Sequence, residues 1–123
     1  MTPTPTPAAS PLQQWQAYAA CWSAADAARG AALAQHVSAD VVYRDPMAEV
    51  SGLDAFGTYM ADFAGAFPGH RFEIDTVDAH HGRSLARWRQ VDPAGEAVAH
   101  GTSLAVHNDA GNLADITGFF PTG

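Results

Sequence analysis

The hydrophobic pattern of this 123-residue chain changes its period once, at Pro68-Gly69, and this change limits what the chain can fold into. Before this point, apolar residues recur at steps of three and four, a spacing typical of amphipathic helices. After it, apolar and polar residues alternate, as they do in half-buried strands. Helices that precede a run of strands favour an α+β domain, in which the helices cover one side of a curved antiparallel sheet.

Three helices are predicted in the first half of the chain. The first begins at Ser10-Pro11, where a capping hydroxyl precedes a proline at the first helical position. Asp26 is expected to cap a second, short helix, and residues 41–44 are expected to form a strand. Ser51 is expected to open the third helix, with Asp54 as the acidic half of a capping box. The apolar positions of this third helix are Leu53, Phe56, Met60, Phe63 and Phe67.

Four antiparallel strands are predicted in the second half. They cover residues 71–78, 84–91, 96–107 and 113–120, and successive strands are separated by turns that contain glycine. Three helices packed over such a sheet would enclose an internal pocket, which gives the domain the shape of a cone.

The composition excludes several classes of function. A net charge of −7, without a cluster of basic residues, is unsuited to nucleic-acid binding. All six basic residues are arginines, so enzymes that form a Schiff base on lysine are excluded. No apolar run is long enough for a membrane span. Residues 1–10 are rich in proline and threonine and do not resemble a signal peptide. We therefore expect a disordered or extended tail over residues 1–10, a single domain over residues 11–123 and a cytoplasmic protein.

The end of the first predicted strand carries the residue of greatest chemical interest. Asp45 precedes Pro46, and a proline disfavours helical geometry in the residue before it. Asp45 is therefore expected to be extended at a strand end, where two interpretations remain open. It could close a turn, or it could be a partly desolvated general base at the mouth of the pocket.

Several short motifs, taken in order, resemble the nuclear transport factor 2-like superfamily in its SnoaL-like branch, which includes ketosteroid isomerases and polyketide cyclases. The resemblance covers about residues 12–120 and implies the cone-shaped α+β fold described above. It implies much less about activity, because this fold hosts enzymes, binding proteins and transport factors. The matching residues are Asp26, Ser38-Ala39-Asp40-Val41-Val42-Tyr43-Arg44-Asp45-Pro46, Gly52, Ala66-Phe67-Pro68-Gly69, Trp88 and Asp109-Ala110-Gly111-Asn112-Leu113.

The resemblance implies roles for three residues. Asp45 matches the general base of ketosteroid isomerases, which lies in their Asp-Pro motif. Tyr18, eight residues before Asp26, matches their oxyanion-donating tyrosine. Ser103 takes the place of their second donor, a protonated aspartate, and a serine hydroxyl can also donate. The cyclase branch carries a catalytic acid near its final strand, where this chain has Gly118-Phe119-Phe120-Pro121, so that chemistry is not implied.

The predicted strand pattern sorts side chains between the pocket and the outer face of the sheet. Alternation places Trp88 inside and Arg87 and Arg89 outside. Leu104 and Val106 would also face outwards, and exposed apolar groups on a sheet suggest a partner. Members of the superfamily commonly dimerise through this face, so the resemblance implies a homodimer. The residues expected to line the pocket and bind a small apolar substrate are Trp15, Trp22, Met60, Phe63, Phe72, Trp88 and Phe120.

No metal site and no cofactor is predicted. His80 and His81 are adjacent and cannot easily chelate one ion. Strand alternation sends His100 outwards, as a surface or interface histidine. The remaining histidines lie near the ends of elements and are expected to be solvated: His36, His70 and His107.

The leading hypothesis is an enzyme that moves a proton on a small apolar carbonyl compound, in an isomerase-type reaction. Asp45 would be the base and Tyr18 the oxyanion donor, with assistance from Ser103. The alternative is a non-catalytic ligand-binding or dimeric accessory protein, in which Asp45 only closes a turn. Epoxide hydrolysis on this fold would need an Asp-Arg-Asp group around a water, and the nearby arginines, Arg87 and Arg89, are expected to face away from the pocket.

Overall fold

The computed structural model describes residues 10–122 and confirms that helices come first and strands follow. The helices are α1 (Pro11–Ala20), α2 (Asp26–His36) and α3 (Leu53–Ala66), with a 3-10 turn at Cys21–Ser23. The strands are β1 (Val37–Asp45), β2 (Ala48–Ser51), β3 (Arg71–His80), β4 (Arg83–Val91), β5 (Ala97–His107) and β6 (Leu113–Phe119). Thus β1 is longer than predicted, and β2 is an additional strand. Of the predicted tail, only Ser10 lies within the described residues, where it caps α1.

The sheet is mixed, which corrects the prediction of a purely antiparallel sheet. Its order is β2-β1-β6-β5-β4-β3, and β1 and β6 run parallel, while all other neighbours are antiparallel. Strands joined by a hairpin must be antiparallel, whereas strands joined by a long connection are free of that restriction. The chain between β1 and β6 includes α3 and four strands, so the sequence pattern did not reveal this pairing.

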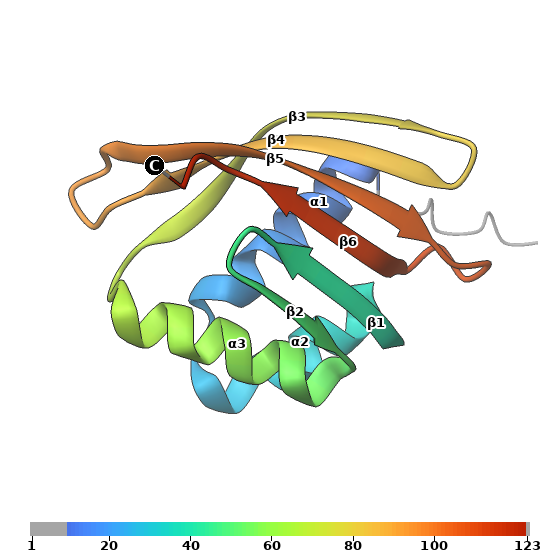
Figure 1. Ribbon diagram of the computed structural model, residues 1–123, viewed down its shortest axis with the longest axis horizontal. Helices are drawn as coiled ribbons and strands as arrows, with labels where there is room; N and C mark the ends of the chain where they lie inside the picture. The colour runs from blue at the N-terminus through green and yellow to red at the C-terminus, as the bar shows by residue number, and fades with distance from the viewer. Residues whose placement is uncertain (1–9, 123) are drawn as a thin grey trace, which may run out of the picture.

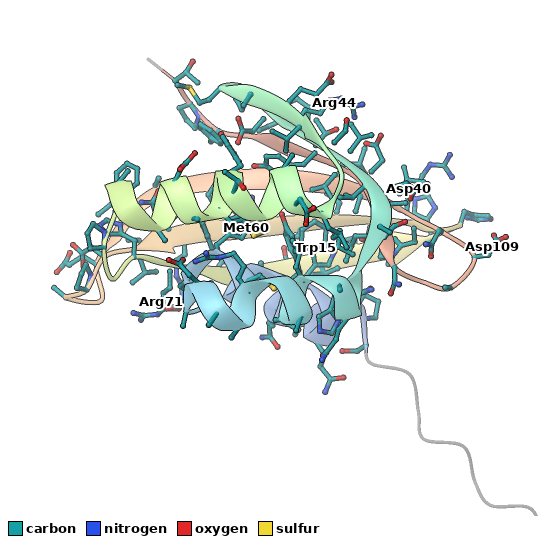
Figure 2. The ribbon with its side chains drawn as sticks, turned by 90° about the horizontal axis from the view of Figure 1, so that it is seen from below. Trp15, Asp40, Arg44, Met60, Arg71 and Asp109 are labelled. Atoms are coloured by element: carbon teal, nitrogen blue, oxygen red, sulfur yellow. The ribbon has the colours of Figure 1, made fainter. Side chains whose placement is uncertain are left out.

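The helices cover one face of the curved sheet, as Figure 1 shows. In this view β3, β4 and β5 cross above α1, while β1 and β2 descend beside α3. The core lies between the two layers and is rich in aromatic side chains, since Trp15 and Phe56 are almost completely buried. Figure 2 shows Trp15 and Met60 near the centre of the molecule, with Arg44 and Asp109 at the periphery. The sheet is curved and not closed, and the three helices cover one of its faces, which is the predicted cone-shaped fold.

The N-cap residue of one helix is the predicted one, and the N-cap residues of the other two helices differ from the prediction. Ser10 and Gln13 form a full capping box at the start of α1. The N-cap of α2 is Ala25, and Asp26 lies in the first turn, where its charge suits the helix dipole. The N-cap of α3 is Gly52, because Ser51 is still paired in β2 and the chain then turns through a φ of 87°, which favours glycine.

No helix within residues 10–122 is long and apolar enough to cross a membrane.

Candidate functional site

A pocket of about 530 Å³ lies between the inner face of the sheet and helices α1 and α3. Its wall is mostly apolar, and its few polar groups come from different elements. A largely apolar cavity with a few convergent polar groups is the usual form of a small-molecule site. The described residues that line it are Trp15, Tyr18, Ala19, Trp22, Tyr43, Asp45, Met47, Tyr59, Asp62, Phe63, Phe67, Phe72, Ile74, Trp88, Gln90, Ala99, Ser103, Phe120, Pro121 and Thr122.

The Asp45 carboxylate takes part in both the turn and the pocket. Its Oδ1 accepts hydrogen bonds from the backbone N–H groups of Met47 (2.8 Å) and Ala48 (3.1 Å), which close the β1–β2 turn. Its Oδ2 accepts hydrogen bonds from the hydroxyls of Tyr43 (2.7 Å) and Tyr59 (2.9 Å). A carboxylate has about four acceptor positions. Oδ1 therefore closes a turn, which is one of the two interpretations drawn from the sequence, while Oδ2 is bonded to two tyrosines that line the pocket.

The two tyrosines bonded to Asp45 were missed as site residues, although the sequence carries a signal for each. Tyr43 lies two residues before Asp45 in β1, so both side chains point to the same face of the sheet. Tyr59 lies three residues after Phe56 and four before Phe63 in α3, so it belongs to the apolar stripe of that helix. Both positions follow from periodicity alone, whereas their bonds to one carboxylate oxygen follow from packing.

The tyrosines of the pocket stay protonated at neutral pH. Burial raises the pKa of Tyr18, Tyr43 and Tyr59 well above the ordinary value, and for Tyr43 and Tyr59 the hydrogen bond to Asp45 acts in the same direction. The Tyr18 pKa is lowered in part by a hydrogen bond that its hydroxyl accepts from the indole N–H of Trp22 at 3.2 Å. All three hydroxyls are therefore hydrogen-bond donors in the pocket.

Ser103 lies on the inner face of β5, close to Asp45 and Tyr43. It is buried, and its hydroxyl accepts a hydrogen bond from the indole N–H of Trp88 at 3.0 Å. Opposite it in the sheet is Gly118. A side chain at Gly118 would begin 3.3 Å from the Ser103 hydroxyl, 3.7 Å from the Cβ of Asp45 and 3.8 Å from the Tyr43 hydroxyl. The glycine leaves open the point where these three residues converge.

All three residues to which chemistry was assigned, Asp45, Tyr18 and Ser103, line this one pocket. The predicted wall residues also line it, with one exception. Met60 is completely buried in the core and does not reach the pocket, and Tyr59, one residue earlier in α3, lies at the wall instead. The wall residues found as expected are Trp15, Trp22, Phe63, Phe72, Trp88 and Phe120.

The histidines lie outside this pocket. His100 is exposed on the outer face, where it pairs with Arg89 in the β4–β5 register. His36, His70 and His107 are half-buried rather than solvated, and His107 lies 2.7 Å from the hydroxyl of Ser84. Within the part of the chain that the structure describes, no three histidine, cysteine or acidic residues are placed to hold a metal ion.

Comparison with known proteins identifies the family. The sequence model of the SnoaL-like domain matches residues 15–116. A proposed isomerase of the SnoaL-like family from Agrobacterium tumefaciens is 27% identical, with a TM-score of 0.84 over 90% of this chain and 97% of the other.

Two more distant structures share the fold. A proposed SnoaL-like polyketide cyclase from Jannaschia sp. CCS1 is 16% identical (TM-score 0.70, 94% of this chain and 91% of the other). A proposed ketosteroid isomerase from Kribbella flavida is 15% identical (TM-score 0.68, 91% and 78%). No curated protein matches the sequence. The family match covers most of the chain, and the chain belongs to the SnoaL-like domain family.

Proposed function

We propose that the protein is a cytoplasmic enzyme that binds a small apolar carbonyl compound and moves a proton on it, in an isomerase-type reaction. One observation carries this proposal: Asp45 and Tyr18, which supply a carboxylate and a hydroxyl, line the same apolar pocket. A carboxylate base and a neutral hydroxyl donor are the two groups needed to form and stabilise an enolate.

The chemistry uses residues already in place. Oδ2 of Asp45 takes a proton from the carbon next to the carbonyl, and the electron pair of the broken C–H bond moves onto the carbonyl oxygen. The Tyr18 hydroxyl donates a hydrogen bond to that oxygen, and Ser103 is the second donor. Asp45 then returns the proton to a different carbon, so that no proton is gained or lost overall.

The hydrogen bonds of Asp45 set a condition on this mechanism. Oδ2 already accepts from Tyr43 and Tyr59, so one of these hydroxyls must move aside before Oδ2 can receive a proton. Tyr43 is buried in the core, whereas Tyr59 is half-buried at the pocket wall and is the one with room to move. Oδ1 stays bound to the turn and holds the carboxylate in position meanwhile.

The test is the conversion of β,γ-unsaturated ketones of increasing size, from cyclohex-3-enone to steroid-sized compounds, into their conjugated isomers, followed by ultraviolet absorbance. Asp45→Asn should lower kcat by about 100-fold or more, the usual scale for a general base. The matched variant Tyr59→Phe removes one hydrogen bond from Oδ2 but keeps the base, so its kcat should stay within about tenfold. Full activity in Asp45→Asn would disprove the assignment of the base.

A second candidate is a ligand-binding protein without catalysis. The observation in its favour is that the described hydrogen bonds already fill all four acceptor positions of Asp45. On this view Asp45 only fixes the turn and the tyrosines. The same ketones then bind to the wild-type protein, by calorimetry, but none is converted at any concentration.

We also propose a homodimer formed through the outer face of the sheet. Leu104 and Val106 on β5 and Phe119 on β6 form an outer apolar patch, and their exposed fractions are 40%, 38% and 60%. Arg87 and Arg89 flank it, but they pair with acidic residues of their own chain. Sedimentation velocity tests this proposal, with Leu104→Asp expected to shift the protein to monomer.

A further inference from the structure

Two of the pocket hydroxyls are paired with an indole. The Nε1–H of Trp22 donates to the Tyr18 hydroxyl at 3.2 Å, and the Nε1–H of Trp88 donates to the Ser103 hydroxyl at 3.0 Å. An indole nitrogen can only donate, while a hydroxyl has one proton and two acceptor lone pairs. In both pairs the hydroxyl oxygen is therefore the acceptor, and the hydroxyl proton points elsewhere.

The protons of these two hydroxyls are free for a ligand. Among residues 10–122, neither the Tyr18 nor the Ser103 hydroxyl donates to a protein acceptor. Tyr43 and Tyr59 differ, because both of their protons are used by Asp45. The pocket thus contains two hydroxyl groups that can donate outwards and two that cannot.

Both indoles are held tightly by their surroundings. The ring of Trp22 packs edge-on against Phe63 and Phe72, with centroids 5.6 Å away in each case. The ring of Trp88 packs edge-on against Phe72 at 5.1 Å and lies across Gly101, where an added Cβ would be only 2.1 Å from it. Rings held in this way keep a fixed N–H direction, which in turn restricts the hydroxyls that accept from them.

We infer that Trp22 and Trp88 are positioning residues that direct the protons of Tyr18 and Ser103 into the pocket. The pocket consequently selects apolar compounds that carry an acceptor oxygen, such as a ketone, over compounds of the same shape without one. This inference rests on the pocket being the ligand site. It does not depend on Asp45 acting as a base.

The experiment compares 9-fluorenone with fluorene, two planar probes that differ by a carbonyl group. Calorimetry measures binding, and infrared difference spectroscopy measures the carbonyl stretch of bound fluorenone, which falls when the oxygen accepts hydrogen bonds. Fluorenone should bind to the wild-type protein more tightly than fluorene. The carbonyl stretching frequency of bound fluorenone should be lower than its frequency in hexane. Tyr18→Phe and Ser103→Ala should each weaken fluorenone binding by about 3- to 10-fold and move the stretch upwards.

The indole variants test the positioning role itself. Trp22→Phe and Trp88→Phe keep both hydroxyls. They should nevertheless broaden the carbonyl stretching band and raise its frequency, because the hydroxyls are no longer held in one direction. Ser84→Ala is the matched control: it breaks the bond that the indole of Trp15 donates to a hydroxyl outside the pocket, so the carbonyl stretching frequency should be unchanged. Melting temperatures show whether each variant is folded, and Ser103→Ala provides a small change should a tryptophan variant fail to fold.

The outcomes separate this inference from the proposed function. A wild-type carbonyl stretching frequency in Trp22→Phe and Trp88→Phe would overturn the positioning role alone. An unchanged frequency in Tyr18→Phe and Ser103→Ala would overturn the donor roles of these two hydroxyls, and with them both this inference and the oxyanion donors of the proposed function. Failure of the wild-type protein to bind fluorenone would overturn both the ligand site and this inference. A shifted stretch together with no turnover of any ketone would support this inference and remove the catalytic proposal.

Discussion

The two faces of the sheet use their polar side chains in different ways. On the inner face they are buried or half-buried and hydrogen-bonded to one another, as in Asp45 with Tyr43 and Tyr59 and in the series of bonds from Trp15 through Ser84 to His107. On the outer face they form exposed ion pairs, such as Arg89 with Glu73 and Asp75. When a buried polar group loses its partner, neither protein nor solvent supplies another hydrogen bond. An exposed ion that loses its partner is hydrated instead. The inner bonds should therefore determine stability far more than the outer ones.

The largest effect should come from Asp45→Ala, because this change removes the acceptor of four hydrogen bonds at once. We expect a loss of about 2–4 kcal/mol in the free energy of unfolding, measured with urea. Asp45→Asn is the matched variant. Its amide oxygen can still accept from the turn, so it should lose clearly less than Asp45→Ala. Equal losses would mean that the turn contributes nothing to the stability of this site.

Ser84→Ala should come next. The carbonyl of Gly111 can only accept, so it fixes a proton on Nδ1 of His107, and Nε2 then accepts from Ser84. Without the serine hydroxyl, the buried N–H of Trp15 and Nε2 of His107 both lose a partner, at a cost of about 1–3 kcal/mol. Urea unfolding measures this loss, with Ser23→Ala as an exposed control that should change little.

Gly101→Ala should show a smaller but clear effect on the same inner face. The new methyl would lie 2.1 Å from the ring of Trp88, which must move and break its bond to Ser103. We expect a loss of about 1–2 kcal/mol by thermal or urea unfolding. Gly57→Ala in α3 meets nothing within 4 Å and should instead stabilise the protein by about 0.5–1 kcal/mol. A neutral Gly101→Ala would show that the Trp88 ring is not tightly held.

The smallest effect should come from Arg89→Ala on the outer face. The hydrogen bond and charge of Arg89 lower the pKa of Glu73 below its ordinary value, so this pair stabilises the fold above that value and loses the contribution as pH falls through the folded pKa. In Arg89→Ala the Glu73 pKa should rise, measured by NMR titration, while stability at neutral pH changes least among these variants. A loss as large as that of Ser84→Ala would contradict the contrast between the faces.

The sequence predicted much of the fold and part of the site for a specific reason. Periodicity depends on the backbone geometry of one element, so it placed Trp88 inwards and Arg87 outwards without knowledge of any partner. It failed at Met60 and Tyr59, which are adjacent in α3, because a helical stripe does not say which of its members faces the core and which faces the pocket. It also failed for the half-buried His107, whose partner Ser84 is 23 residues away in the chain.

By itself, the sequence determined the order of helices and strands and the position of Asp45 at the end of β1, because both depend on local backbone preferences. Only the tertiary structure decided that β1 runs parallel to β6 and that Tyr43 and Tyr59 share one oxygen of Asp45. It also decided that Trp88 donates to Ser103, since that bond depends on the register between β4 and β5. Register and packing join residues far apart in the chain, and no local pattern records them.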